Sequence, residues 1–242
     1  KFPYIIIFSK VMCTFMTKNL EPLFKSINNY LELLHREIDL APSCVPLSTL
    51  YIGGGTPSLL SSKNINALLE HLRNKFGFQP GAEITMEMDP ASFELDDLNA
   101  FLESGVNRVS LGAQSFDDKV LEKLGRTHRR NHLFECCRWL VDSTNAGLLK
   151  SWSLDLIQSL PGQNLIDWRN QLNQAIKLNP PHLSIYDLSI EPGTVFDWLM
   201  RKGELDLPDE DLSAEMMDLT SAILSEAGFA RYEISNYALP GH

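Results

Sequence analysis

Short apolar runs alternate with longer amphipathic stretches along almost the whole chain, and this alternation limits the folds that the sequence can adopt. Six runs have the length and composition of buried strands, at residues 4–8, 49–52, 83–87, 108–111, 153–157 and 182–188. The stretches between them carry apolar residues at helical spacing, around residues 65–76, 98–102, 133–141, 168–176 and 216–224. Ser61 or Ser62 can cap the first of these helices, and Gly105 and Gly228 can end the second and the last.

This repeated strand–helix alternation predicts an α/β fold in which parallel strands are joined by crossover helices. Two architectures fit the pattern equally well, a doubly wound sheet and a closed or partly closed barrel. The 242 residues suffice for one large domain or two small ones. Because no linker stands out, we expect a single domain over residues 1–242.

Composition excludes some classes of function. The net charge of −10, from 21 basic and 31 acidic residues, argues against a protein that binds nucleic acid by bulk attraction to phosphate. No apolar run approaches the roughly 18–20 residues of a transmembrane helix, so we expect no membrane span. The four cysteines show no disulfide spacing, and the pattern around Cys136 and Cys137 predicts buried thiols. A reducing compartment fits, namely the cytoplasm or, as the alternative, an organelle stroma or matrix.

Polar and glycine residues gather where the predicted strands end, which is where both architectures place their chemistry. These segments are 53–56 after the second run, 87–90 at the end of the third, 112–115 after the fourth, 160–163 after the fifth and 186–189 at the end of the sixth. Asp155 lies within the fifth run itself. The pattern therefore predicts that one ligand site lies at the carboxyl ends of the strands.

Three consecutive glycines, Gly53, Gly54 and Gly55, follow the second run. Bare backbone lets the polar groups of a ligand approach N–H and C=O groups directly, although a plain strand-to-helix turn is the alternative. The spacing is not G-x-G-x-x-G, and no G-K-[ST] follows. The segment is therefore neither a dinucleotide fingerprint nor a P-loop.

Glu87 stands beside Ile84 and Met86, where a strand buried on both faces would carry apolar residues. A buried carboxylate is costly unless it is paired or hydrogen-bonded, and the alternative is an edge strand with Glu87 facing solvent. Gln114 and Asp155 raise the same question on later strands. A ligand that carries hydroxyl groups and an amine would satisfy all three side chains.

A small basic cluster lies between the fourth and fifth runs. Arg126 is either a clamp for a ligand carboxylate or a solvated surface arginine. His128 and His132 lie near it, but a metal site needs more ligands than these two. We therefore expect both to be surface histidines.

Seven segments occur in an order that resembles a known family: "GGGTPSLL", "EMDP", "RVSLGAQSF", "LGRTH", "SLDLIQSLPGQ", "HLSIYDLSIEPGT" and "RYEISNYALPGH". This is the radical S-adenosylmethionine family that contains oxygen-independent coproporphyrinogen III oxidase and the heme chaperone HemW. The resemblance runs from about Tyr4 to His242, and "YEISNYA" favours the HemW branch. It implies a partial (β/α)6 TIM-like barrel of parallel strands. It also implies a role in heme or porphyrin metabolism, with a chaperone favoured over an oxidase.

The resemblance also implies a set of residues that bind S-adenosylmethionine. The glycine motif that holds the methionine end of the cofactor corresponds to Gly54, Gly55 and Thr56. The acidic, glutamine, arginine and strand-five aspartate positions of the family correspond to Glu87, Gln114, Arg126 and Asp155. The backbone around Ser189 corresponds to the adenine side, and Tyr4 in the first strand completes the set.

The chain departs from the family just after the first strand. The family carries C-x3-C-x2-C there, and its three thiolates hold a [4Fe–4S] cluster. With one residue deleted, Ser9, Cys13 and Met16 occupy those positions, so that only Cys13 keeps the family's metal ligand. A hydroxyl and a thioether are poor substitutes for thiolates at iron–sulfur clusters. The resemblance therefore predicts a cofactor pocket without a stable cluster.

The chain also stops at His242, before the family's heme-binding H-N-x-x-Y-W segment and its small C-terminal domain, which we therefore expect to be absent. Three hypotheses follow. One is a radical S-adenosylmethionine protein of the HemW or coproporphyrinogen dehydrogenase type with a degenerate cluster site, for which enzyme activity stays open. Another is an inactive barrel that binds S-adenosylmethionine or heme without a cluster. An unrelated barrel enzyme is a third alternative.

Overall fold

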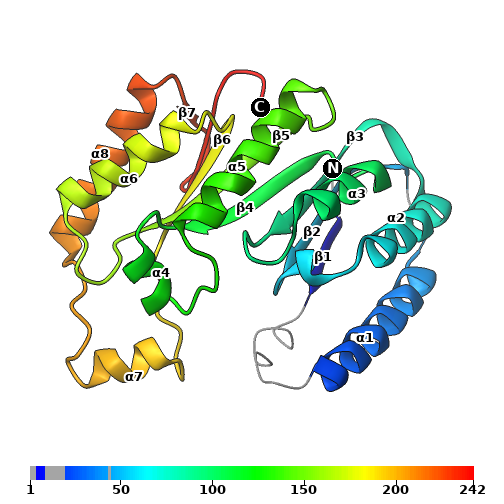
Figure 1. Ribbon diagram of the computed structural model, residues 1–242, viewed down its shortest axis with the longest axis horizontal. Coiled ribbons are helices and arrows are strands. Elements are labelled where there is room, and N and C mark those ends of the chain that lie inside the picture. The colour runs from blue at the N-terminus through cyan, green and yellow to red at the C-terminus, as the bar shows by residue number, and fades with distance from the viewer. Residues whose placement is uncertain (1–3, 9–19, 43–44) are drawn as a thin grey trace. The chain divides into compact units, whose positions relative to one another are not determined.

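The computed structural model describes residues 4–8, 20–42 and 45–242, with side chains from residue 27 onward (Figure 1). The chain divides into two compact units. The first comprises Lys1–Ser110 with Ser143–Lys150, and the second comprises Leu111–Asp142 with Ser151–His242.

The first unit is built on three parallel strands, β1 (Tyr4–Phe8), β2 (Leu47–Gly54) and β3 (Phe78–Met88). Its described helices are α1 (Leu20–Leu40), α2 (Ser62–Phe76) and α3 (Leu95–Ser104), and the 3-10 turn η2 (Pro57–Leu59) follows β2. As predicted, Ser61 caps α2, because its side chain accepts a hydrogen bond from the backbone N–H of Asn64. The expected apolar stripe of α2 is buried, and Gly105 ends α3 in a left-handed conformation.

Strand β4 (Arg108–Gln114) and helix α5 (Arg130–Asn145) have residues in both units. The second unit contains the parallel pair β5 (Ser151–Gln158) and β6 (His182–Asp187). Two short strands, β7 (Ala230–Arg231) and β8 (Asn236–Ala238), pair antiparallel with each other, and β8 pairs with β6. The other helices are α4 (Asp118–Lys123), α6 (Leu165–Lys177), α7 (Val195–Arg201) and α8 (Glu210–Glu226).

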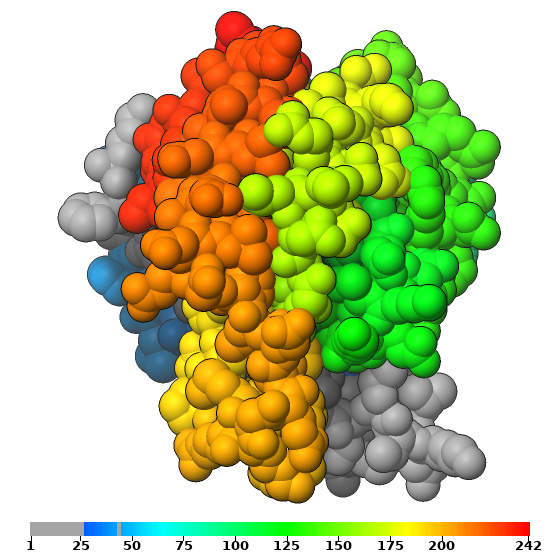
Figure 2. Space-filling model, turned by 90° about the vertical axis from the view of Figure 1, so that its left-hand side faces the viewer, coloured from blue at the N-terminus to red at the C-terminus, as the bar shows by residue number. Residues whose placement is uncertain are grey.

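Helices α6 and α8 lie side by side in both views (Figures 1 and 2). Between them, the indole N–H of Trp168 donates to the hydroxyl of Thr220 at 2.7 Å, and that hydroxyl contacts the side-chain oxygen of Gln158 at 3.0 Å. Trp168 and Thr220 are both 1% exposed. A buried hydrogen-bonded chain therefore joins both helices to strand β5.

The strand order is β1-β2-β3-β4-β5-β6-β8-β7, so that the six predicted strands follow one another in sequence order. The prediction of an α/β fold with a mostly parallel sheet of the partial TIM-barrel type is confirmed. The apolar pattern did not reveal α1, α4, α7 or the two short strands. It also placed the start of β3 five residues late, because Gln79, Pro80 and Gly81 are exposed and carry no strand signal.

Two predictions for single side chains have clear outcomes. Cys136 and Cys137 are each 1% exposed, as expected, and burial together with the neighbouring Cys136 raises the pKa of the Cys137 thiol. The expectation for His128 was wrong. Its side chain is fully buried, and its Nε2 lies 3.1 Å from the carbonyl oxygen of Ala113, so the ring packs behind β4. His132 is exposed, as predicted.

Among the described residues, no helix combines the length and apolar character that crossing a membrane requires.

Candidate functional site

The end of strand β2 and the end of strand β3 meet at the carboxylate of Glu87. The backbone N–H of Gly54 donates to Glu87 Oε2 at 3.0 Å, and the hydroxyl of Tyr51 donates to Glu87 Oε1 at 2.8 Å. Glu87 is half-buried, and β3 is an internal strand between β2 and β4, so the edge-strand interpretation is wrong. The two donors compensate the carboxylate for the water that it loses in the sheet.

Two of the three glycines are required by this arrangement. A Cβ atom on Gly53 would lie 2.7 Å from Tyr51 Cε1 and 2.9 Å from Glu87 Oε1, and both distances are shorter than real Cβ contacts. Gly54 has a φ of 116°, which side-chain-bearing residues rarely adopt. The bare backbone therefore accommodates the Tyr51–Glu87 pair within the protein itself.

Tyr51 is a functional candidate that the sequence pattern did not identify, and Gly53 belongs to the glycine segment but not to the predicted ligand set. They lie two residues apart, so both face the same side of β2. In the register, Ile52 lies opposite Met86, which places Gly53 beside Glu87. Only this register links the tyrosine to the carboxylate, since 36 residues separate them in the sequence.

The loops that follow these two strands are tied together as well. The buried Ser58, in η2, accepts a hydrogen bond from the backbone N–H of Asp89 at 3.1 Å, and its hydroxyl contacts that of Ser92. Gly55 and Thr56 are half-buried between Gly54 and this turn. The "GTPS" and "EMDP" segments therefore form one hydrogen-bonded rim at the carboxyl ends of β2 and β3.

In the second unit, Gln114 ends β4 with a φ of 63° and is half-buried. A positive φ is uncommon for a residue with a side chain, and it is found most often at functional or strained positions. Arg126 is half-buried, and its carbonyl oxygen accepts a hydrogen bond from Arg129 Nη1 at 2.7 Å. Both interpretations of Arg126, a carboxylate clamp and a solvated surface arginine, stay open, and a ligand contact remains a prediction for Gln114 and Arg126 alike.

Asp155 lies half-buried in β5, where its Oδ1 accepts a hydrogen bond from the hydroxyl of Ser153 at 2.9 Å. Ser189 is exposed beyond the end of β6. It lines a concave surface together with Lys123, Leu124 and Thr194. Asp155 thus lies in the carboxyl-terminal half of β5, and Ser189 lies just after the carboxyl end of β6.

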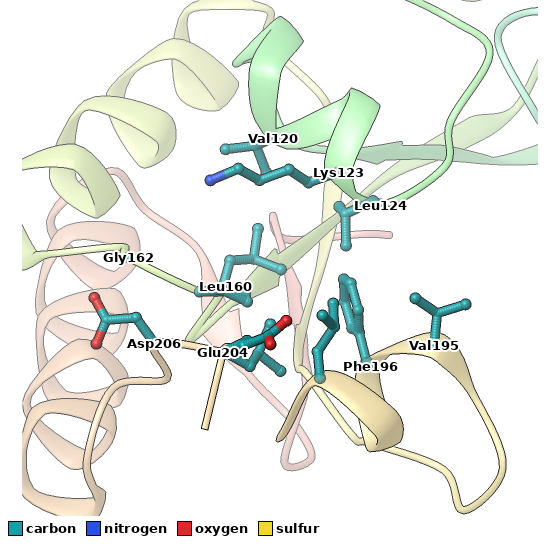
Figure 3. Close-up of a pocket in the computed structure, with 12 residues that line it drawn as sticks. Val120, Lys123, Leu124, Leu160, Gly162, Val195, Phe196, Glu204 and Asp206 are labelled. Atoms are coloured by element: carbon teal, nitrogen blue, oxygen red, sulfur yellow. The ribbon is translucent and has the colours of Figure 1, made fainter. Parts of the chain in front are cut away.

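A cavity of about 380 Å³ adjoins that surface (Figure 3). It lies among α4, the loop after β5, α7 and the segment 204–206. Most of its wall is apolar, with Leu160 and Phe196 turned into it, while Lys123, Glu204 and Asp206 supply charged groups (Figure 3). The loop at Gly162 is held by a hydrogen bond from its N–H to the carbonyl oxygen of Asp206 at 2.7 Å. This cavity suits a flat or apolar group of moderate size.

The structure brings Gly54 and Glu87, two of the predicted ligand residues, into direct contact. Tyr4 lies opposite Leu50 in the β1–β2 pair, and its side chain is outside the described residues. Ser9, Cys13 and Met16 also lie outside the described residues. Among the residues that are described, no group of three or more His, Cys, Asp or Glu side chains could hold a metal ion.

The residues fit the two cofactors of the predicted family unequally. The rim at Gly54 and Glu87 presents a fixed carboxylate next to bare backbone, which suits the charged amino acid end of S-adenosylmethionine. The set Ser9, Cys13 and Met16 contains one thiol, which does not fit a [4Fe–4S] cluster.

Comparison with known proteins identifies the superfamily to which the chain belongs. The radical SAM superfamily matches residues 12–173, so the chain belongs to this superfamily. Among solved structures, coproporphyrinogen III oxidase (HemN) from Escherichia coli superposes with a TM-score of 0.76 at 28% identity, over 89% of this chain and 49% of that one. The archaeal Elp3 from Methanocaldococcus infernus shares the fold at a TM-score of 0.61 and 15% identity.

Among curated relatives, several heme chaperones named HemW are similar to this chain. The heme chaperone HemW of Synechocystis is 39% identical over 217 residues, which are 89% of this chain and 52% of the relative. The HemW of Escherichia coli is 41% identical over 196 residues, or 81% of this chain and 50% of the relative. The chain thus spans about half the length of these relatives. The resemblance seen in the sequence is confirmed.

Proposed function

We propose that this chain binds S-adenosylmethionine at the carboxyl ends of its strands, with Glu87 as the acceptor for the ligand's ammonium group. The observation that carries the proposal is the pair of hydrogen bonds that fixes Glu87, from Tyr51 and from the backbone of Gly54. An ionised carboxylate has about four acceptor positions, so two donors leave capacity for a cationic ligand. The fixed geometry lowers the entropy that is lost on binding.

The remaining predicted residues have distinct roles in this proposal. Gly54, Gly55 and Thr56 offer backbone groups to the methionine end, and Arg126 pairs with its carboxylate. Gln114 donates or accepts hydrogen bonds, and Asp155 accepts them, at polar groups of the ligand. Ser189 borders the adenine side, where the cavity at Leu160 and Phe196 supplies apolar surface. Tyr4, in β1, completes the predicted set.

We further propose that the protein handles heme or a related porphyrin as a chaperone rather than as an oxidase. The support is its 39% and 41% identity to curated heme chaperones, against 28% identity to the oxidase structure. A mitochondrial relative from mouse is 39% identical over 197 residues. The compartment that we propose is the cytoplasm, with an organelle matrix as the alternative.

The second candidate function is ligand binding without radical chemistry. A [4Fe–4S] cluster would supply the electron for cleaving S-adenosylmethionine if the chain held one. The donor set Ser9, Cys13 and Met16 favours a chain that lacks this electron source. Under this candidate, the chain retains S-adenosylmethionine or heme as a ligand.

Calorimetry with S-adenosylmethionine tests the first proposal. For the cluster-free chain we expect a dissociation constant near millimolar, because a few hydrogen bonds to charged groups contribute only several kcal/mol in total, and each 1.4 kcal/mol is about tenfold. Glu87→Gln should weaken binding about tenfold or more, since it removes the charge but keeps the shape. Glu70→Gln is the matched control, because Glu70 is exposed on α2, where its Oε1 accepts a hydrogen bond from the side chain of Asn66.

Equal affinity of wild type and Glu87→Gln would refute the role of Glu87. A separate titration with hemin, followed in the Soret band, tests the heme proposal. Anaerobic reconstitution with iron and sulfide, followed by iron analysis, decides between the two candidate functions.

A further inference from the structure

Strands β5 and β6 bury three polar side chains that the proposed ligand site does not itself explain. Ser153, His182 and Ser184 are 0%, 4% and 3% exposed. In the parallel register, Ser153 lies opposite His182, and Asp155 lies opposite Ser184. Because residues two apart share one face of a strand, all four belong to the same face of the sheet. Buried polar groups are costly unless they are hydrogen-bonded, so their partners decide their role.

These side chains form a continuous chain of hydrogen bonds. The hydroxyl of Tyr232 lies 2.8 Å from His182 Nε2, and His182 Nδ1 lies 2.8 Å from Ser153 Oγ. Ser153 Oγ in turn donates to Asp155 Oδ1 at 2.9 Å and lies 3.0 Å from Ser184 Oγ. These hydrogen bonds therefore connect Tyr232, which is 62% exposed, with the half-buried carboxylate of Asp155.

The number of available hydrogens fixes which group donates and which accepts in each of these hydrogen bonds. A serine hydroxyl has one hydrogen and two acceptor positions. The ionised Asp155 only accepts, so it takes the single hydrogen of Ser153. Ser153 Oγ must then accept from both remaining neighbours, the hydroxyl of Ser184 and Nδ1–H of His182. A neutral His182 consequently carries its hydrogen on Nδ1 and accepts the hydroxyl hydrogen of Tyr232 at Nε2.

We propose that His182 is a positioning residue for Asp155. Its Nδ1–H fixes the orientation of the Ser153 hydroxyl, and the Ser153 hydroxyl fixes the carboxylate of Asp155 in the orientation that receives the ligand. Tyr232 holds the imidazole in the required tautomer from the surface side. This inference rests on the proposed function in one respect, namely that Asp155 contacts S-adenosylmethionine.

The loop that carries Tyr232 is built to hold it in place. It joins β7 to β8, and the backbone N–H of Tyr232 donates to the carbonyl oxygen of Asn236 at 3.2 Å. The guanidinium of Arg231 donates to the carbonyl oxygen of Ile234 at 2.7 Å, which closes the loop. The rings of Tyr232 and His182 are tilted by 57° with centroids 5.8 Å apart. The tyrosine therefore reaches the histidine through an ordered turn of the "RYEISNYA" segment.

The first arm of the test reads the tautomer and needs no ligand. Full-length protein with ring-labelled histidine is measured by two-bond proton–nitrogen NMR near pH 8.5, about two units above the ordinary pKa of histidine. His182→Asn identifies the signal among the six histidines. In wild type we expect the Nδ1–H tautomer of His182. Asp155→Asn changes the group that Ser153 contacts on the side away from the ring. It should shift the ring toward the other tautomer, because an amide can donate to Ser153 and free its hydrogen for Nδ1.

The second arm reads ligand affinity by calorimetry with S-adenosylmethionine. His182→Leu removes the donor to Ser153, and we expect an affinity loss of about tenfold, the usual consequence of losing one well-placed hydrogen bond near a charge. His182→Asn keeps an N–H donor near the position of Nδ1, and it should restore affinity to within about threefold of wild type. His242→Leu makes the same change at an exposed histidine next to Ser151 and serves as the matched control. If His182→Leu fails to fold, Ser153→Ala replaces it, since it breaks the same chain with a smaller change.

The outcomes separate this inference from the proposed function. An Nε2–H tautomer in wild type, or a tautomer that Asp155→Asn leaves unchanged, overturns the inference whatever the ligand does. Equal affinities of His182→Leu, His182→Asn and wild type also overturn it. The wild type could fail to bind S-adenosylmethionine and still show the predicted tautomer and its response to Asp155→Asn. That result refutes the proposed ligand and supports the hydrogen-bond chain from Tyr232 to Asp155.

Discussion

The substitution Gly53→Ala tests the steric argument for the glycine segment. The new methyl group would lie 2.7 Å from Tyr51 Cε1 and 2.9 Å from Glu87 Oε1, so at least one of these side chains must move. The φ of Gly53 is not in the left-handed region, so alanine causes no backbone strain there. The cost is therefore the clash and the loss of the Tyr51–Glu87 hydrogen bond.

The two contributions give the magnitude of the effect. Overpacking a well-packed site costs about 1–3 kcal/mol, and a hydrogen bond to a charged group contributes about 1.5–3 kcal/mol. Because Tyr51 and Glu87 are half-buried and part of the clash relaxes when the bond breaks, we expect a loss of about 2–4 kcal/mol in the free energy of unfolding. The same displacement should weaken S-adenosylmethionine binding.

Urea unfolding followed by circular dichroism measures the stability change. Gly147→Ala is the comparison, because its φ of 73° brings strain while no atom lies within 4 Å of the added Cβ. In a Tyr51→Ala background the cost of Gly53→Ala should fall, since the shortest contact disappears. A Gly53→Ala variant with the unfolding midpoint of wild type would refute the steric reasoning.

Three further predictions follow from other parts of the chain. Burial is the largest cause that lowers the pKa of His35, the neighbouring His71 adds to it, and Asp39 opposes the shift. His35 therefore binds a proton less readily in the folded protein than in the unfolded chain. The free energy of unfolding should therefore fall as the pH drops through about 6.5. Urea midpoints measured across that pH range should show a smaller fall for His35→Gln than for wild type. Thr220→Val leaves the indole N–H of Trp168 without its acceptor in the core, and we expect a loss of about 1–3 kcal/mol by the same unfolding assay. Replacing both Ser9 and Met16 by cysteine should raise iron uptake on anaerobic reconstitution above that of wild type, whereas equal iron content in the two proteins would show that the proposed register is wrong.

The sequence by itself determined the alternation of elements, and with it the class of fold. Hydrophobic periodicity is a local property, so the stripe of α2 and its cap at Ser61 were readable from the consecutive residues 61–76. Elements with too few residues for a period, such as β7 and α7, escaped the same reasoning. The ordered segments from "GGGTPSLL" to "RYEISNYALPGH" also determined the family, because each keeps a local pattern.

Only the tertiary structure decided which side chains meet. Tyr51 and Glu87 are 36 residues apart, and His182 and Tyr232 are 50 residues apart, so neither pair leaves a local signal in the sequence. His128 was assigned to the surface because His128 and His132 are too few ligands for a metal site, whereas the packing behind β4 buries His128 completely. Strand register and helix packing set these contacts, and a shift of one residue in the register would turn Gly53 and Glu87 to opposite faces of the sheet.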